Sequence, residues 1–116
     1  MTEQAYLVLL ALAEQPRHGY GIVQAVRDLS DGSIRMGAGT LYGILDRLVS
    51  EAYAEASGEV VVDGRLRRYY RLTEPGGAAL AVETARLQAL AARAQRVLRA
   101  GPARPAVGPG TVAGLA

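Results

Sequence analysis

Two groups of residues in the sequence have types and spacings that suit contact with phosphates and bases. Gly37, Gly39 and Gly43 lie at the start of and inside a segment whose apolar residues repeat at helical spacing, where each interior glycine costs roughly 0.5–1 kcal/mol relative to alanine. Four of the 13 basic residues fall within residues 65–71, and all 13 are arginine, which suits phosphate and base-edge recognition. A GC-rich coding bias is the simpler explanation for the missing lysine. The positions of the arginines therefore have to show whether they serve nucleic-acid recognition.

Catalysis has little support in the composition. The chain contains a single histidine, His18, and no cysteine, which excludes disulfides, thiol catalysis and zinc bound by cysteine. No repeated spacing of carboxylates and histidine suggests a catalytic or metal site. The sequence therefore predicts no enzyme, no bound metal and no cofactor.

The length and composition are those of a small domain with an appendage. Half of the 116 residues are apolar, and the net charge of +2 is too weak by itself to indicate a nucleic-acid partner. The apolar run 6–13 is too short to span a bilayer, and it lacks the basic flank of a signal peptide because Glu3 is the only charge before it. We therefore expect a cytoplasmic protein without a membrane partner.

Three short helices are predicted in the first half of the chain. The first covers about 2–14 with Thr2 as its N-cap, and its apolar residues cover nearly the whole circumference, which predicts burial against both its own domain and a second subunit. The second covers about 18–29 and the third about 38–52. Three short helices with brief connections are the minimal set for a helix-turn-helix core.

Residues 53–73 change to the pattern of two β-strands. β-branched and aromatic residues flank a central Asp63-Gly64, and this dipeptide favours a type I′ hairpin turn because both central residues need φ > 0. Ser57-Gly58 is a second place at which the loop can begin, so the strand register stays open at this point.

A long final helix is predicted over 74–100, with Thr73 as its cap and Pro75 in its first turn. Apolar residues recur along it with the spacing of a coiled coil, and they stay exposed unless a second subunit covers them. Residues 101–116 are rich in proline and glycine and are predicted to be a flexible tail. The predicted dimer contacts, on the first and last helices, are Tyr6, Leu10, Leu80, Leu87, Leu90, Ala94 and Val97.

The order of these elements, α-α-α-β-β-α, defines the expected fold class. It is a mainly α fold with a small β-hairpin, an α+β winged helix-turn-helix with a C-terminal dimerisation helix. We expect three parts: a DNA-binding winged helix-turn-helix domain over 1–73, the dimerisation helix over 74–100 and the tail over 101–116.

On a helical wheel the third helix separates a core face from a polar face. Leu41 and Leu45 lie on the core face, and Gly39 and Gly43 lie opposite to them. The N-terminal part of the second helix of a helix-turn-helix motif enters the major groove, and a missing side chain there allows close approach to phosphates or base edges. The alternatives are that Gly37 and Gly39 merely form the turn and N-cap, and that Gly43 packs tightly against another helix.

The second strand of the hairpin supplies the other predicted contacts. If Tyr70 and Leu72 face the core, strand alternation turns Arg67, Tyr69 and Arg71 outward, and the two remaining arginines lie near the hairpin tip. A solvated strand face is the alternative. The predicted DNA contacts on the third helix and the wing are Gly39, Thr40, Tyr42, Gly43, Arg47, Arg65, Arg67, Arg68, Tyr69 and Arg71.

Three motifs in order make the sequence resemble the PadR family of bacterial transcriptional regulators, over residues 3 to about 100: HGYGI (18–22), GAGTLYGILDRL (37–48) and RRYYRLTEPG (67–76). The single C-terminal helix resembles the family's small subfamily. The resemblance implies a homodimeric repressor whose third helix and wing bind a palindromic operator, with Thr40 and Tyr42 facing the DNA. It also implies a small aromatic or cationic effector, for which we expect a site at the dimer interface.

Some residues depart from the family pattern or have two interpretations. The family usually has proline where this chain has Gly43 and glycine where it has Ala52. The chain has no tryptophan, so the binding of planar drugs between interface tryptophans in some small members does not carry over. His18 and Tyr20 begin the second helix, whose amides can meet a phosphate. The alternative is structural, with His18 as a helix cap and Tyr20 as a packing residue.

The sequence thus predicts a DNA-binding transcriptional regulator, a ligand-responsive repressor that binds a palindromic double-stranded operator as a homodimer. A winged-helix module that binds a protein instead of DNA is the alternative. The polar face of the third helix and the arginines of the wing favour DNA, because a protein-binding module would more often expose apolar residues there.

Overall fold

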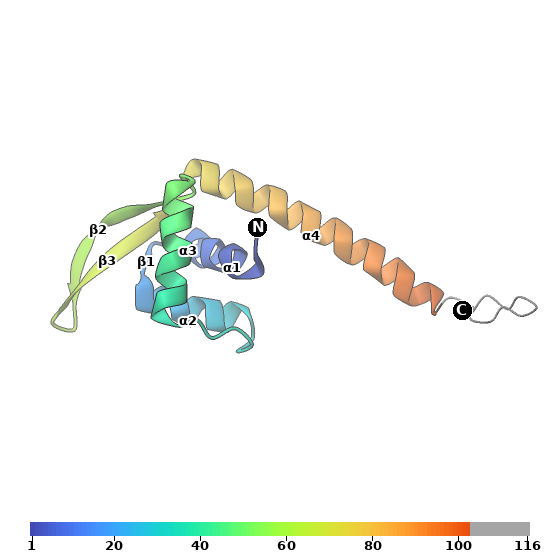
Figure 1. Cartoon of the computed structure of the whole chain (residues 1–116), viewed down its shortest axis with the longest axis horizontal. Helices are drawn as coiled ribbons and strands as arrows, with labels where there is room; N and C mark the ends of the chain where they lie inside the picture. The colour runs from blue at the N-terminus through green and yellow to red at the C-terminus, as the bar shows by residue number, and fades with distance from the viewer. Residues whose placement is uncertain (103–116) are drawn as a thin grey trace, which may run out of the picture. The chain divides into compact units, whose positions relative to one another are not determined.

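The computed structural model describes residues 1–102 of the chain (Figure 1). The elements in this part are α1 (Glu3–Glu14), β1 (Arg17–His18), α2 (Gly19–Leu29), α3 (Ala38–Ser50), β2 (Ala54–Val62), β3 (Arg65–Leu72) and α4 (Glu74–Ala100). The predicted order of elements is confirmed, with one addition, the short strand β1, which the sequence did not predict. The predicted flexible tail, 101–116, lies outside the described residues from residue 103 onward.

The winged-helix body comprises Met1–Ala85 and includes the first part of α4. A second compact unit begins at Arg86. The boundary expected after residue 73 follows the end of the last strand, and that division into parts stays a prediction. None of the helices in residues 1–102 is both long and apolar enough to cross a membrane.

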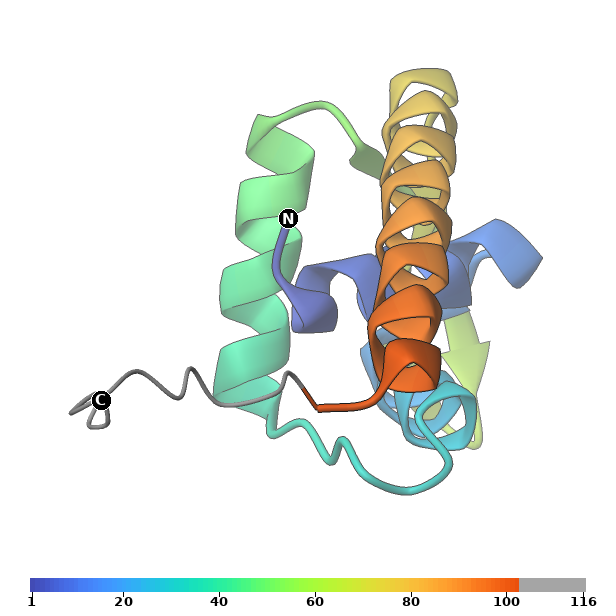
Figure 2. The same cartoon turned by 90° about the vertical axis from the view of Figure 1, so that its right-hand side faces the viewer.

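The core lies where α1 packs against α2 and α3, and α3 crosses α1 steeply in both views (Figures 1 and 2). Five of the 12 residues of α1 are buried, so this helix is the centre of the body. Leu9, Ile22 and Leu45, one from each helix, have no exposed surface. Burying such a side chain stabilises the fold by about 1.5–3 kcal/mol, which fixes the three helices relative to one another.

Two predicted helix caps are confirmed. The Thr2 hydroxyl oxygen accepts a hydrogen bond from the Ala5 N–H (3.1 Å) and begins α1. The Thr73 hydroxyl oxygen accepts from the Gly76 N–H (3.0 Å) and also donates to the carbonyl of Ala52. Each cap satisfies a backbone donor that has no partner inside its helix.

Helix α3 ends at Ser50, two residues earlier than predicted. Ala52 has φ +65°, and the Tyr53 N–H donates to the carbonyl of Leu48 (2.8 Å), which closes the helix in a Schellman motif. Alanine pays about 1–2 kcal/mol for this left-handed conformation, which glycine adopts freely. The turn places Tyr53 against α4, where a Cβ on Gly76 would collide with the Tyr53 carbonyl.

The three strands form an antiparallel sheet in the order β1-β3-β2. Asp63 (φ +51°) and Gly64 (φ +76°) form the hairpin turn with the positive φ values that a type I′ turn requires, so this prediction is confirmed. The alternative that Ser57-Gly58 begins the loop is wrong. A bulge lies between Ala56 and Gly58 instead, with Gly58 at φ +126°, and the ladder continues beyond it to the turn.

Candidate nucleic-acid interface

Helix α3 turns its leucines toward the core and its glycines away from it. Leu41, Leu45 and Leu48 are at most 2% exposed. An added Cβ at Gly39 or Gly43 would meet no atom within 4 Å in the part of the chain that the structure describes. The alternative that Gly43 packs tightly against another helix is therefore wrong, and the two glycines leave a flat, open surface on α3.

The start of α3 is also free of bulk. Gly37 is the N-cap, with extended backbone and no capping side chain, so the simpler interpretation of this glycine is confirmed. Gly39 lies inside the first turn, where it is not needed as a cap. Thr40 and Tyr42 are exposed beside it, and the Tyr42 hydroxyl lies against Gly19, the first residue of α2.

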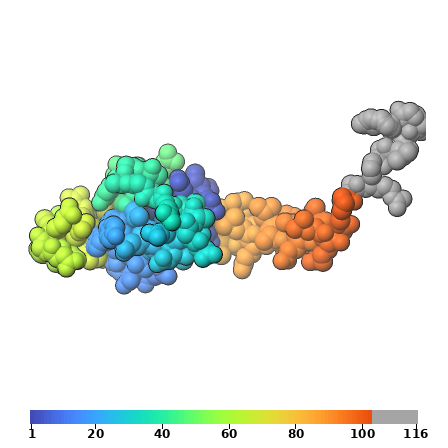
Figure 3. Space-filling view, turned by 90° about the horizontal axis from the view of Figure 1, so that it is seen from below, coloured from blue at the N-terminus to red at the C-terminus, as the bar shows by residue number. Residues whose placement is uncertain are grey.

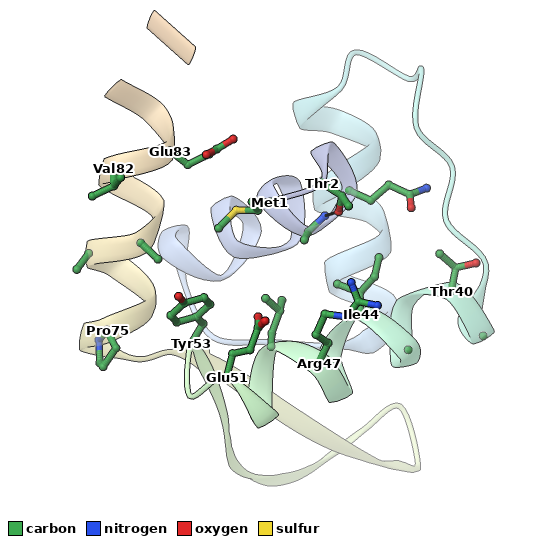
Figure 4. A pocket seen from close by; sticks show the side chains of 17 residues that line it. Met1, Thr2, Thr40, Ile44, Arg47, Glu51, Tyr53, Pro75, Val82 and Glu83 are labelled. Atoms are coloured by element: carbon green, nitrogen blue, oxygen red, sulfur yellow. Dashed lines mark hydrogen bonds between the residues drawn. The ribbon is translucent and has the colours of Figure 1, made fainter. Parts of the chain in front are cut away.

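Thr40 and Arg47 lie on the side of α3 that borders an open groove of about 1280 Å³ (Figure 4). The groove lies between the N-terminus of α1, the exposed side of α3 and the first part of α4. Its walls include the side chains of Met1, Ile44, Tyr53 and Val82, together with Glu51. The sequence did not predict this groove, because its walls come from three segments that are far apart along the chain.

The hairpin, β2 and β3, forms the wing and lies next to β1 and α2 (Figure 3). The β3 side chains that pack against the core are Tyr70 and Leu72, as expected. Arg71 is exposed, but Arg67 and Tyr69 are half-buried and only partly face outward. Tyr69 is half-buried because strand β1 pairs with β3 beside it. This pairing places the His18 ring edge-on to the Tyr69 ring, with 5.3 Å between the ring centroids.

Two of the four wing arginines are paired with acidic residues across the hairpin. Nε of Arg71 donates to a carboxylate oxygen of Glu55 (2.6 Å), and Arg68 lies 3.9 Å from Glu59. Both glutamates are the direct cross-strand neighbours of their arginines. Glu59 is placed opposite Arg68 by the hairpin turn, and the bulge between Ala56 and Gly58 then places Glu55 opposite Arg71. The wing arginines that form no ion pair within residues 1–102 are Arg65 and Arg67.

His18 joins the wing to α2. Its Nδ1 accepts a hydrogen bond from the Gly21 N–H (3.2 Å), so the structural alternative for His18, a helix cap, is confirmed. Burial, and then the positive charge of Arg67, lower the pKa of His18, which favours the neutral ring that this acceptor role needs. Nε of Arg67 is buried without a hydrogen-bond partner among the described residues. Tyr20 is 58% exposed, so the alternative of a packing residue is wrong for it.

The residues predicted to form a dimer differ in how much surface they leave free. Leu80 is buried in the core of its own chain, and the Tyr6 hydroxyl shares a hydrogen bond with that of Thr84 (2.7 Å). Leu90 and Val97 are 47% and 68% exposed. The other members are the half-buried Leu10 and Leu87 and the exposed Ala94.

Comparison with known families decides what kind of protein this is. The model of the transcriptional regulator PadR-like family matches residues 8–82. The chain belongs to the PadR-like family. The resemblance seen in the three sequence motifs is confirmed, and so is the prediction that the chain is not an enzyme, because this is a family of transcriptional regulators.

Individual relatives agree with this assignment. The chain is 39% identical over 84 residues to the transcriptional regulator Rv3488 of Mycobacterium tuberculosis, an alignment that covers 72% of this chain and 75% of that protein. A PadR family regulator from Clostridium difficile has the same fold, with a TM-score of 0.72, 23% identity, and coverage of 84% of this chain and 99% of that one.

The winged-helix part is also similar to Bacillus subtilis PadR, whose structure was solved in complex with operator DNA. The TM-score is 0.60 at 18% identity, and the match covers 69% of this chain and 45% of that one. These likenesses confirm the predicted fold class, an α+β winged helix followed by a C-terminal helix. By family, the chain is thus a PadR-like transcriptional regulator, and its fold is that of the solved PadR-family structures.

Proposed function

We propose that this PadR-family regulator binds a palindromic operator as a homodimer and acts in the cytoplasm as a ligand-responsive repressor. The observation that carries the proposal is the exposed, glycine-lined start of α3 on a helix whose opposite face is buried. The helix backbone can approach base edges closely there, while Thr40 and Tyr42 donate to phosphates or bases.

The wing would contact the DNA phosphates beside the major groove that α3 enters. Arg65 and Arg67 can do so without losing an ion pair, whereas Arg68 and Arg71 have to exchange a glutamate for a phosphate. The proposed DNA contacts remain Gly39, Thr40, Tyr42, Gly43, Arg47, Arg65, Arg67, Arg68, Tyr69 and Arg71.

The proposed dimer forms through α4, residues 74–100, with help from α1. Leu90 and Val97 are apolar and exposed, and a second copy of the helix would remove them from water. Leu80 and Tyr6 would support the interface from inside their own chain. A two-fold dimer presents two copies of α3, which is why we propose an operator with palindromic half-sites.

The groove beside α3 supports the proposal of an effector. Its apolar walls, the ring of Tyr53 and the carboxylate of Glu51 suit a small aromatic or cationic compound. A compound in this groove would touch both α3 and the first part of α4, the proposed dimerisation helix. The groove is also lined by Gly39, Thr40, Gly43 and Arg47, which are among the proposed DNA contacts. A bound compound would therefore occupy part of the surface proposed for the operator and favour the DNA-free protein, which is the requirement for a ligand-controlled repressor.

Selection from a random pool of double-stranded DNA tests the proposal. We expect a palindromic sequence to be enriched, and light scattering of the complex to give two chains per operator. A variant with Thr40→Ala and Tyr42→Ala serves as the control, because both side chains are exposed and their loss should abolish enrichment without unfolding the protein. Enrichment of no sequence would contradict DNA recognition and favour a winged-helix module that binds protein.

A further inference from the structure

Gly19 begins α2 and is buried, yet its backbone has no need of glycine. Its φ is not positive, unlike those of Gly32, Gly58, Gly64 and Gly101. Its backbone is helical, a conformation that alanine adopts at least as readily. Local conformation therefore does not explain why the side chain is missing at this position.

The neighbour of Gly19 explains it. A Cβ at Gly19 would lie 2.5 Å from the hydroxyl oxygen and 3.1 Å from Cζ of Tyr42, which belongs to α3. The hydroxyl would have to move by about 0.9 Å to reach the 3.4 Å at which ordinary contact begins. At Gly21, two residues further along α2, the nearest atoms to an added Cβ would belong to Arg17 and His18, at 3.7 Å, which is ordinary contact.

We propose that Gly19 is a positioning residue for Tyr42. Its missing side chain leaves the space in which the Tyr42 ring lies, so that the hydroxyl is held between the start of α2 and α3. This hydroxyl has no hydrogen-bond partner among residues 1–102, and Tyr42 is 44% exposed, so it is available to a DNA phosphate. The inference rests on the proposed function, in which Tyr42 contacts the operator.

Moving the hydroxyl by this distance matters because hydrogen bonds weaken steeply with length and angle. A methyl group at Gly19 would push the Tyr42 phenol away from α2. The other protein–DNA contacts fix the position of the phosphate, so the hydrogen bond from the displaced hydroxyl would become longer and less well aligned. The cost should be close to that of one hydrogen bond to a charged group, which corresponds to about a tenfold loss of operator affinity.

The first measurement compares Gly19→Ala with Gly21→Ala in the full chain, using the selected operator in a fluorescence anisotropy titration. Both variants replace a glycine of α2 by a better helix former, so thermal unfolding should show that both remain folded. We expect Gly19→Ala to bind the operator about tenfold more weakly and Gly21→Ala to bind within about twofold of wild type. Equal binding by Gly19→Ala and wild type would overturn the proposal.

The second measurement repeats Gly19→Ala in a Tyr42→Ala background. Tyr42 is exposed on the helix surface, so its replacement should not unfold the protein. If Gly19 acts through Tyr42, the substitution at Gly19 should cost no further affinity once the ring is gone. A tenfold loss that persists in this background would overturn the positioning role, because Gly19 would then act through another group.

The third measurement needs no DNA. The ring signal of Tyr42 in a tyrosine-labelled NMR spectrum, assigned by its absence in Tyr42→Ala, should shift in Gly19→Ala and stay in place in Gly21→Ala. An unchanged signal in Gly19→Ala would overturn the positioning role alone. A shifted signal together with wild-type operator binding by Tyr42→Ala would support the positioning and overturn the DNA contact of Tyr42, so the two failures can be told apart.

Discussion

Helix α3 and the wing, the two regions proposed to contact DNA, are built in opposite ways. α3 is fixed to the core by three leucines that are at most 2% exposed, Leu41, Leu45 and Leu48. The far end of the wing has no such anchor, because Val61 and Leu66 are 67% and 64% exposed. The strand ladder holds the wing together, whereas the core holds α3.

The two regions also differ in charge. On the exposed side of α3 one aspartate and one arginine, Asp46 and Arg47, follow each other in sequence. The hairpin carries four arginines against two glutamates and one aspartate, a net charge of +1. These differences indicate that α3 suits contacts that need a fixed backbone close to the bases. The wing instead suits adjustable, salt-dependent contacts with phosphates.

The largest effect should come from the anchor of α3. Leu45→Ala removes a side chain with no exposed surface and should lower the free energy of unfolding by about 2–5 kcal/mol. Leu66→Ala in the wing, with 64% exposure, serves as the matched control and should change it by less than about 0.5 kcal/mol. Urea unfolding measures both, and similar losses for the two variants would contradict the contrast between the regions.

The same contrast separates what could be predicted from the sequence from what could not. The caps by Thr2 and Thr73 and the turn at Asp63-Gly64 depend on contacts within four residues, so the local sequence is enough to predict them. The core face of α3 follows from leucine spacing for the same reason. These local features determine the body of the fold and the place of α3 in it.

The features that the sequence did not predict depend on pairing between residues that are far apart in the chain. Strand β1 has only two residues, too few for an alternating pattern, and exists because Tyr69 and Tyr70 pair with it. The bulge before Gly58 shifts the register by one residue, and this shift sets Glu55 opposite Arg71. A sequence pattern shows four arginines in the wing, but it does not show that two of them are already paired.

The next prediction concerns the open surface of α3 at Gly43. Gly43→Ala should raise the free energy of unfolding by about 0.5–1 kcal/mol, because the added Cβ meets no atom and alanine favours the helix. Gly43→Leu should also stay folded, but its longer side chain should hold the helix away from the DNA and lower operator affinity at least about tenfold. Chemical unfolding and an anisotropy titration measure the two quantities. Wild-type affinity in Gly43→Leu would show that DNA does not approach this side of α3.

A smaller effect is expected in the wing, where charge rather than shape decides. Replacing Glu55 and Glu59 together by glutamine frees two arginines for phosphates. Operator affinity should rise about threefold, within the range that exposed ion pairs contribute. The dependence of the binding constant on salt should also become steeper, because more counterions are released from the DNA.

The control for this variant changes the net charge by the same amount elsewhere. Glu3→Gln with Asp28→Asn removes two exposed carboxylates from α1 and α2 and leaves the wing as it is. If the control tightens binding as much as the wing variant does, overall charge explains the effect and the ion pairs of the wing do not. An unchanged salt dependence in the wing variant would show that the freed arginines do not reach phosphates.

The smallest effect should appear where α2 and the wing meet, at His18. Burial and the charge of Arg67 lower its pKa below the ordinary value of 6.5, so the folded state binds a proton less readily than the unfolded state. The stability that His18 contributes is therefore complete above pH 6.5 and is lost as the pH falls through the lowered pKa. Protonation also removes the Nδ1 lone pair that accepts from the Gly21 N–H, and it adds a positive charge at the start of α2, where the helix dipole disfavours it.

His18→Asn isolates this contribution, because asparagine can still cap the helix but does not titrate. Urea unfolding of both proteins from about pH 8 to about pH 5 covers the ordinary range of histidine, while carboxylates titrate mostly below it. The free energy of unfolding of the wild type should fall relative to that of His18→Asn as the pH decreases. If the difference in free energy of unfolding between the two proteins does not change with pH, His18 keeps its ordinary pKa in the folded protein. The neutral His18 ring would then not be required for the contact between α2 and the wing.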